Sequence, residues 1–553
     1  MVGQMLVIKW IRAPRALLIL VLLALTACGG PRAIETRPDD PANLPERYGL
    51  VAFKVISNTD RLAPALQNWT GAFAVDLDDM EKRYFLAAGG TGLNSSRVFV
   101  GAMPPGEYGI FLLQSFLRHA DGSTWLNAPV PRGLGNFRVE EGRLTSLGSM
   151  VYQPLGQVGE GRDQTNLYVI ARFDDEEPLE DFVAEAFPQA WAGIQTDLIL
   201  GWEPDEHELE RQDMADRLRR FARGIEPHRL PNGQAILTAP MGQIRLREGQ
   251  GSWRRIDTGQ NRHIGAVVAH GDGYLAGGER GLVMQAPSLE GPWEHLPGPS
   301  TQENVVWLHS DPVGGVVALA QKGWDVTFYA VSPDFSSWRK VAEFDSRPPL
   351  LWPRSGLVHG VSKSDGRVVI FGERERLVFD PVSGAVERFE SRNLYHVTQQ
   401  EDGTIVALPG RWWTGVANPE FSRDYGATWT TIRPVRDLES WQGASPPVVL
   451  PGDEFAVLSN QAYQDPQTRR RRHESELRLR VGVDNQILHW GEQLPEGCAR
   501  LVPLISGPNG IFVSCNDGRL LLSTDGGRTW TVDLDTTMDE DDAPELLRQR
   551  QTT

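Results

Sequence analysis

One short pattern near the C-terminal end constrains the fold of this chain more than any other feature. SRDYGATWTTI (422–432) and STDGGRTWTVDL (523–534) both contain S-x-D-x-G-x-T-W, 101 positions apart. In such a pattern the carboxylate can accept hydrogen bonds from turn N–H groups, glycine allows a positive φ, and tryptophan offers a large apolar face. Each copy therefore predicts a hairpin between two strands. The matched residues are Ser422, Asp424, Gly426, Thr428 and Trp429, and Ser523, Asp525, Gly527, Thr529 and Trp530.

The two hairpins belong to a longer repeat that starts near Arg229. Each unit contains an apolar strand, a DG or NG turn, two short strands, a tryptophan or a substitute, and a final strand, as in 263–296 and 499–534. The 277 residues between Trp253 and Trp530 hold six steps of about 46 residues, which is the period of a β-propeller blade. The intervening markers are Trp293, Trp338, Phe389, Trp429 and the tryptophan of a longer unit, Trp490.

Seven units account for this repeat, at about 229–259, 260–299, 302–345, 350–391, 393–436, 441–494 and 498–536. The first is short by one strand, which we expect a terminal segment to supply. The sixth carries an insertion. Seven blades are therefore favoured, and six or eight stay open.

The S-x-D-x-G-x-T-W boxes resemble the Asp boxes of the bacterial neuraminidase repeat (BNR), a sialidase-like β-propeller superfamily. That family includes sialidases, the luminal domain of sortilin and a photosystem II assembly factor. The resemblance covers residues 229–536 and implies a propeller there. Because Asp boxes lie at the periphery of such propellers, it also implies that Asp424 and Asp525 are structural and that neither box is catalytic.

The resemblance leaves two functions open, one catalytic and one not. A sialidase needs an arginine cluster for the substrate carboxylate, a tyrosine–glutamate pair and an acid. HRLPNG (228–233) resembles the R-I-P signature of that family, which makes Arg229 a candidate ligand, but the other catalytic residues match no position. No G-x-S-x-G elbow, phosphate loop or closely spaced histidine pair is present, so we expect no cofactor and no metal. A non-catalytic propeller that binds a protein or glycan partner is favoured over a sialidase-like glycoside hydrolase.

Aromatic and arginine residues at the starts of strands or in loops are the candidates for that binding. In a propeller one rim collects the loops that lead into the innermost strands, and such side chains are typical of binding hot spots. The alternative for each aromatic is packing between blades. Besides Arg229, the candidates are Trp307, Trp352, Arg354, Tyr395 and Trp412.

The N-terminal residues 1–27 have the features of a lipoprotein signal peptide. Lys9, Arg12 and Arg15 precede ALLILVLLAL (16–25), an apolar run too short to span a bilayer, and LTAC (25–28) resembles a bacterial lipobox. The resemblance implies cleavage before Cys28, lipidation of its thiol and, with Gly29 following, an outer-membrane location in the cell envelope. Removing the three cations shifts the formal charge from −17 to −20, which argues against a nucleic-acid partner.

The region before the repeat predicts further units. Polar, proline-rich residues 28–46 predict a tether, and short strands rich in β-branched and aromatic residues predict an antiparallel β-sandwich over 47–173. Residues 174–228 predict a helical linker, with helices at 177–187 and 204–223, and residues 537–553 predict an acidic, polar tail. The fold class is therefore mainly all-β.

Cys498 and Cys515 flank one predicted hairpin, whose turn is SGPNG (506–510). An envelope compartment permits a disulfide between them. Symmetry about the turn would not place them quite opposite each other, so the sequence leaves the pairing open.

Overall fold

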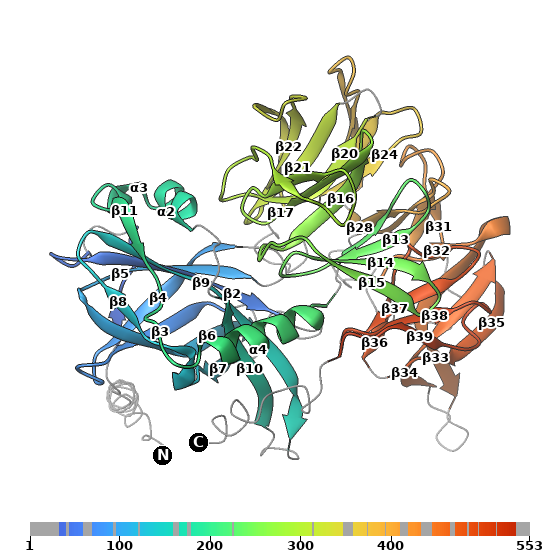
Figure 1. Cartoon of the computed structure of the whole chain (residues 1–553). Helices are drawn as coiled ribbons and strands as arrows, with labels where there is room; N and C mark the ends of the chain where they lie inside the picture. Colours follow the sequence, from blue (N-terminus) through green and yellow to red (C-terminus); the bar gives the residue numbers. More distant parts are fainter. Residues whose placement is uncertain are drawn as a thin grey trace, which may run out of the picture.

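The computed structural model describes most of the chain and shows a mainly β protein in two parts, an N-terminal sheet and a seven-bladed β-propeller (Figure 1). The described residues are 33–39, 44–58, 69–91, 96–119, 122–158, 165–173, 179–223, 226–311, 315–346, 358–372, 374–392, 394–409, 418–432, 445–464, 471–483, 486–495, 497–515 and 517–537. Within these ranges, no helix is long and apolar enough to cross a membrane.

The N-terminal part is one sheet of eleven strands. These are β1 (Ile34–Glu35), β2 (Gly49–Ser57), β3 (Gly71–Asp76), β4 (Arg83–Thr91), β5 (Arg97–Met103), β6 (Gly106–His119), β7 (Gly122–Pro129), β8 (Phe137–Val139), β9 (Arg143–Val158), β10 (Thr165–Phe173) and β11 (Gln195–Leu200). Eight of them follow the order β10-β9-β2-β5-β4-β3-β6-β7, and β1, β8 and β11 pair with β4, β6 and β9.

This sheet differs from a wholly antiparallel sandwich. The pairs β1–β4, β2–β9 and β11–β9 are parallel. One face of the sheet bends around a single core that takes side chains from strands β2 to β10, including Phe53, Tyr108 and Phe137. Because strand residues alternate between faces, the other face is left to be covered by different elements.

Helices cover that outer face on the β10-β9-β2-β5 half. The helices α2 (Glu180–Ala186) and α3 (Pro188–Trp191) pack on Leu50, Val98 and Leu144, and α4 (Glu208–Arg220) packs on β9 and β10. The expected helical linker 174–228 is therefore not a separate unit. Its α2, α3 and β11 belong to the N-terminal part, and its last residues begin the propeller.

The helix α4 and strand β2 join the two parts. Met214 and Leu218 of α4 share a core with Met241 of the propeller. Beside this core, the fully buried Lys54 of β2 donates from Nζ to the Asn261 carbonyl at 2.8 Å and lies 3.4 Å from Glu279 Oε2. Burial lowers the pKa of Lys54 well below its ordinary value. Removing either partner of such a buried pair is strongly destabilising, because the remaining group stays buried without its counterpart.

The propeller is built of seven four-stranded antiparallel sheets in chain order. Blades 1 to 4 comprise β12 (Glu226–Arg229), β13 (Ala235–Thr238), β14 (Gln243–Gly249) and β15 (Ser252–Asp257); β16 (Ile264–His270), β17 (Gly273–Gly278), β18 (Val283–Ala286) and β19 (Glu294–His295); β20 (Asn304–Ser310), β21 (Val316–Lys322), β22 (Asp325–Val331) and β23 (Trp338–Asp345); and β24 (His359–Ser362), β25 (Val368–Phe371), β26 (Glu375–Phe379) and β27 (Val386–Glu390). Blades 5 to 7 comprise β28 (Leu394–Gln399), β29 (Ile405–Pro409), β30 (Glu420–Ser422) and β31 (Thr430–Thr431); β32 (Val448–Val449), β33 (Glu454–Gln464), β34 (Arg471–Val483) and β35 (Gln486–Gln493); and β36 (Cys498–Leu501), β37 (Ile511–Cys515), β38 (Leu520–Ser523) and β39 (Thr531–Leu534).

Each pair of neighbouring blades encloses its own hydrophobic core, including blades 7 and 1, so the sheets form a closed ring. Neighbouring residues of one strand enter different cores. Ile236 faces blade 2 whereas Leu237 faces blade 7, and Val316 faces blade 2 whereas Val317 faces blade 4. Both faces of the strand are buried, which explains the continuous apolar runs in the sequence.

The recurring tryptophans pack back against the preceding blade. Trp429 of blade 5 contacts Phe371 of blade 4, with ring centroids 6.1 Å apart, and Trp338 of blade 3 donates to the Pro297 carbonyl near blade 2 at 3.1 Å. Phe389 does not follow this pattern, because it is 40 % exposed and lies under the Arg376 guanidinium. The tryptophan phase thus predicted the blades, and its substitute in blade 4 lies at the expected phase but is exposed.

Blade 1 is complete without a terminal strand, contrary to the expectation from the sequence. Its innermost strand is β12, so the propeller starts at Glu226 and not at Arg229. Side chains close the ring instead. The buried Asp533 of blade 7 accepts two hydrogen bonds from Arg247, at 2.9 and 3.0 Å, and one each from Gly251 N and Trp253 Nε1 of blade 1, both at 2.8 Å.

The expected tether 28–46 is in part ordered on the sheet. Ile34 and Glu35 pair with Tyr84 and Phe85 of β4. The following Thr36 is buried and donates from Oγ1 to the Phe85 carbonyl at 2.8 Å. Cys28 and most of the expected tail, 538–553, lie outside the described residues.

Candidate functional site

The seven innermost strands surround a cavity of about 680 Å³ on the propeller axis. Each strand is short, between two and seven residues, and together they contribute both apolar and polar side chains to the lining. Concave, pre-formed cavities of this size are the usual location of binding sites. The cavity is therefore the candidate functional site.

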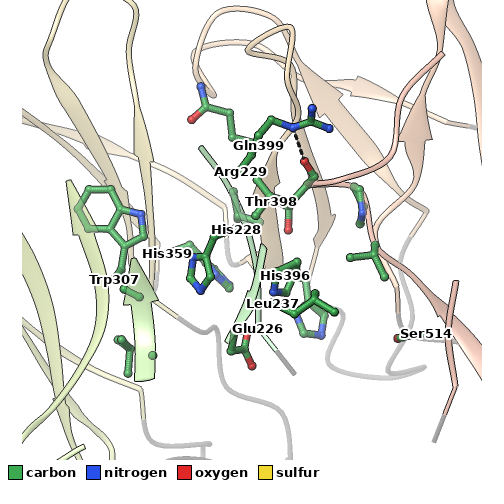
Figure 2. A pocket seen from close by; sticks show the side chains of 18 of the residues that line it. Glu226, His228, Arg229, Leu237, Trp307, His359, His396, Thr398, Gln399 and Ser514 are labelled. Carbon is green, nitrogen blue, oxygen red and sulfur yellow. Dashed lines mark hydrogen bonds between the residues drawn. The ribbon is translucent and has the colours of Figure 1, made fainter. Parts of the chain in front are cut away.

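Three histidines line the middle of the cavity. Figure 2 shows His228, His359 and His396 converging there from blades 1, 4 and 5. The rings of His359 and His396 lie 6.4 Å apart. Burial lowers the pKa of His228 to about 4, against a smaller opposing effect of Glu226, so His228 is neutral near pH 7. Within the described residues, no three His, Cys, Asp or Glu side chains lie where they could hold a metal ion together.

Trp307 borders the same cavity and also packs between blades. Its indole lies against the backbone of Gly360 in blade 4, where a Cβ atom would come within 2.4 Å of the ring. The ring also stacks on His309, with centroids 6.2 Å apart, and His309 Nδ1 lies 2.8 Å from Ser362 Oγ of blade 4. Trp307 therefore packs between blades 3 and 4 and also borders the cavity, and its role in binding stays a prediction.

Side-chain amides tie the innermost strands of blades 4, 5 and 6 together. Gln399 accepts from Ser362 N at 3.1 Å and donates to the Ser362 carbonyl at 2.7 Å. Gln400 makes the same pair of bonds with Val449, at 2.8 and 3.1 Å. These bonds satisfy backbone groups that have no ladder partner, because neighbouring inner strands diverge around the axis.

Arg229 spans one mouth of the cavity. Its Nε donates to the Leu504 carbonyl at 3.1 Å, the bond drawn in Figure 2. Its Nη1 lies 2.9 Å from Glu401 Oε2 and donates to the Gly233 carbonyl at 3.2 Å. All three partners lie in turns that link the first and second strands of blades 1, 5 and 7. The guanidinium thus links blades 1, 5 and 7 at this mouth of the cavity.

The charged residues that line the cavity are mostly cationic, although the chain as a whole is acidic. Only one described lining residue is a carboxylate, Glu226, and none is a tyrosine or lysine, whereas four are arginines: Arg223, Arg229, Arg500 and Arg519. Arg519 pairs with Asp517 at 2.6 Å. A sialidase needs a tyrosine–glutamate pair beside its acid, and the described lining does not supply one. What this arrangement offers is hydrogen bonding, an aromatic edge and positive charge.

The two S-x-D-x-G-x-T-W boxes lie elsewhere, on the outer hairpins β30–β31 and β38–β39. Asp525 Oδ1 accepts from Ser523 Oγ at 2.8 Å and from Thr529 N at 2.9 Å, and Oδ2 accepts from Thr529 Oγ1 at 2.7 Å. Gly527 has φ +85° and donates to Ser523 Oγ at 2.7 Å. The bonds from Thr529 lower the pKa of Asp525 to about 2. This carboxylate therefore stabilises the turn between β38 and β39.

The first box repeats the same bonds. Asp424 accepts from Ser422 Oγ and Thr428 N at 2.8 Å and from Thr428 Oγ1 at 2.6 Å, and Gly426 has φ +80°. Neither carboxylate is among the residues that line the cavity. Trp429 and Trp530 pack into the cores between blades 4 and 5 and between blades 6 and 7.

Cys498 and Cys515 form a disulfide and face each other directly across β36 and β37. The expectation that they would not lie quite opposite was wrong. A register shift between Cys498 and Arg500 inserts one residue into β36 and brings the two cysteines into line.

The structure brings together two of the six predicted binding residues, Trp307 and Arg229. Tyr395 is part of β28, but its side chain is not described, and Trp352, Arg354 and Trp412 lie outside the described residues. The sequence interpretation missed His228, His359 and Arg500. Their common signal is position, since each lies on the innermost strand of a blade, and a correct assignment of those strands would have found them.

Comparisons with known proteins add little to this picture. No protein-family model matches the chain, and no curated protein matches it. Among solved structures, virginiamycin B lyase from Staphylococcus aureus is similar at a TM-score of 0.35 and 10 % identity, over 54 % of this chain and 94 % of that chain. Sqt1 from Saccharomyces cerevisiae is similar at 0.36 and 11 %, over 57 % and 86 %. YCF48 from Cyanidioschyzon merolae is similar at 0.30 and 11 %, over 58 % and 87 %.

Proposed function

We propose that this chain is an envelope lipoprotein whose propeller binds a protein or glycan partner without catalysing a reaction, in an assembly or scaffolding role. On this proposal Cys28 carries the lipid, the outer membrane is the favoured location, and the propeller is a member of the Asp-box superfamily. The anchor is supported by the sequence from Lys9 to Gly29 alone.

One observation carries the binding function. The axial cavity is large enough for a side chain or a sugar, yet its described lining holds one carboxylate, Glu226, and no tyrosine. Several polar groups around it, including Arg229 and Gln399, are already bonded to neighbouring blades. A wall held in this way is pre-organised for binding, which lowers the entropic cost of association.

Photo-crosslinking tests the cavity as the binding site. Arg500 lines the cavity, and Glu387 is exposed on the outermost strand of blade 4. A photoreactive amino acid at position 500 is expected to give a partner adduct in intact cells, and the same group at position 387 is expected to give none. Adducts from both positions alike, or from position 387 alone, would move the binding surface away from the axis. Unchanged melting temperatures show that both variants fold.

The anchor and the alternative chemistry each have a separate test. Cys28→Ser is expected to abolish the lipid mass on the mature chain and to release the protein from the membrane pellet. Incubation with a fluorogenic sialoside is expected to give no hydrolysis. Turnover that is lost on Arg229→Ala, with the fold retained, would reinstate the glycoside hydrolase.

A further inference from the structure

On its β4-β3-β6-β7 half the sheet carries a partly exposed aromatic surface that no helix of the described ranges covers, which we call the aromatic face. It consists of Phe73, Phe85, Phe111, Phe116 and Trp125. Ring centroids join Phe73 to Phe85 at 5.1 Å, Phe73 to Phe111 at 6.0 Å and Phe116 to Trp125 at 4.4 Å. Trp125 is 56 % exposed and Phe116 is 37 % exposed. Single exposed aromatics are ordinary, but a row across four strands marks an interaction surface.

The described side chains of the row form two aromatic groups with an uncharged pair between them. Gln114 and Asn127 lie between its two ends and share a hydrogen bond of 3.0 Å. The Arg83 guanidinium lies over the Phe111 ring, 5.4 Å from its centroid, and at the same edge Glu35, the register partner of Phe85, pairs with Arg37 at 3.8 Å. The strong negative charge of the whole chain is therefore not concentrated on this surface.

The aromatic face points away from the propeller. Both halves of the sheet enclose the same core, so their outer faces point in opposite directions. The outer face of the β10-β9-β2-β5 half is covered by α2, α3 and α4, and α4 in turn contacts the propeller. In Figure 1 α4 lies between the sheet and the propeller accordingly.

The position of β1 ties the expected anchor to this face. Ile34 pairs with Tyr84 and Glu35 with Phe85, so the chain reaches the sheet at the edge of the aromatic face. Cys28 precedes Ile34 by six residues. Six residues span at most about 20 Å when fully extended. A lipid on Cys28 therefore holds this edge of the sheet within about 20 Å of the bilayer.

We propose that the aromatic face rests on the phospholipid bilayer to which Cys28 is anchored, so that the propeller is held out into the aqueous compartment. This inference rests on the lipid anchor of the proposed function. Tryptophan and phenylalanine bind the boundary between headgroups and acyl chains, and a second weak contact adds to a lipid anchor. The remaining negative charge of the chain is screened beyond about 8 Å at physiological salt, so it does not prevent contact with zwitterionic lipid.

Spin labelling of the lipidated full-length mature protein in phosphatidylcholine vesicles tests this orientation. A label at Asn127→Cys, in the middle of the face, is expected to show a several-fold rise in collisions with lipid-soluble oxygen over a water-soluble nickel chelate. A label at Glu387→Cys, on the propeller, is expected to stay in water. The Phe116→Ala/Trp125→Ala double variant is expected to abolish the rise at position 127. The matched control Trp324→Ala, which removes a propeller tryptophan of 51 % exposure, is expected to preserve it.

The outcomes separate this inference from the anchor itself. A mature chain without a lipid mass refutes the proposed anchor. A lipidated, vesicle-bound chain whose label at position 127 stays in water refutes the orientation and leaves the anchor standing. If that label is instead immobilised only by an added protein or glycan, the face is a docking surface for a macromolecule and the proposal is wrong.

Discussion

Asp533→Ala is the sharpest test of how the ring is closed. The Asp533 side chain is fully buried, and it accepts two bonds from Arg247 and two N–H bonds from blade 1. Breaking a buried ion pair by removing one partner costs about 3–5 kcal/mol. Arg247 keeps 23 % exposure and can turn partly to water, so we expect the lower end, about 3 kcal/mol.

The assay is equilibrium denaturation, with amide hydrogen exchange as the local readout. Exchange is expected to speed up in β15 and β39, the outer strands on either side of the closure, before the other blades. The control is Asp453→Ala, which breaks an ion pair between blades 5 and 6 whose partners are 54 % and 64 % exposed. Exposed pairs contribute about 0–1 kcal/mol. Equal losses in the two variants would refute the view that Asp533 closes the ring.

The same carboxylate predicts a dependence on acid. Burial opposes ionisation, but the bonds from Arg247, Gly251 and Trp253 outweigh it, so the pKa of Asp533 is lowered in the folded state. A lowered folded-state pKa stabilises the fold above the unfolded-state pKa of about 3.9, and this contribution is lost as pH falls through the folded value. The difference between wild type and Asp533→Ala should therefore shrink below about pH 4. A difference that grows there would contradict the assignment.

Two further predictions concern blade 7 and its neighbours. Cys498→Ser/Cys515→Ser opens a disulfide across 17 residues and should lower the free energy of unfolding by about 2–3 kcal/mol, and denaturation of the variant should no longer respond to reductant. Gly527→Ala adds a Cβ at φ +85° that would lie 2.4 Å from Leu479 Cδ2, whereas Gly251→Ala adds one at φ +66° with no atom within 4 Å. Calorimetry should show a loss of about 3 kcal/mol for the first and about 1 kcal/mol for the second. Equal losses would mean that Leu479 moves aside without cost.

The propeller could be predicted because its cores leave a strong sequence signal. Both faces of inner strands such as β13 and β21 are buried, and a tryptophan such as Trp429 or Trp338 packs against the preceding blade in most blades, blade 4 with Phe389 being an exception. The innermost strand β12 left no such signal. Its residues Glu226 to Arg229 face the cavity and the turns around it, so they are polar and include a proline.

Two other misses have similarly local causes. The strand β1 is two residues long and pairs with the sheet through its backbone, which composition cannot reveal. The cysteines align only through the register shift after Cys498, and a shift of one residue is invisible to a symmetry argument. Within the cavity, Arg229 pairs with Glu401 of this chain, a contact that the sequence does not indicate, and its role as a ligand stays a prediction.

The contact that Asp533 makes between blades 7 and 1 has a consequence for biosynthesis. Blades 1 to 6 are translated before Asp533, the residue that joins blade 7 to blade 1, so the ring stays open until the last blade has been made. A stop codon or a protease cut just before Asp533 would leave nearly every strand intact, but the propeller would lack the contact that closes its ring. Such products expose the side of blade 1 that the intact molecule hides, which is the kind of surface that degradation machinery recognises.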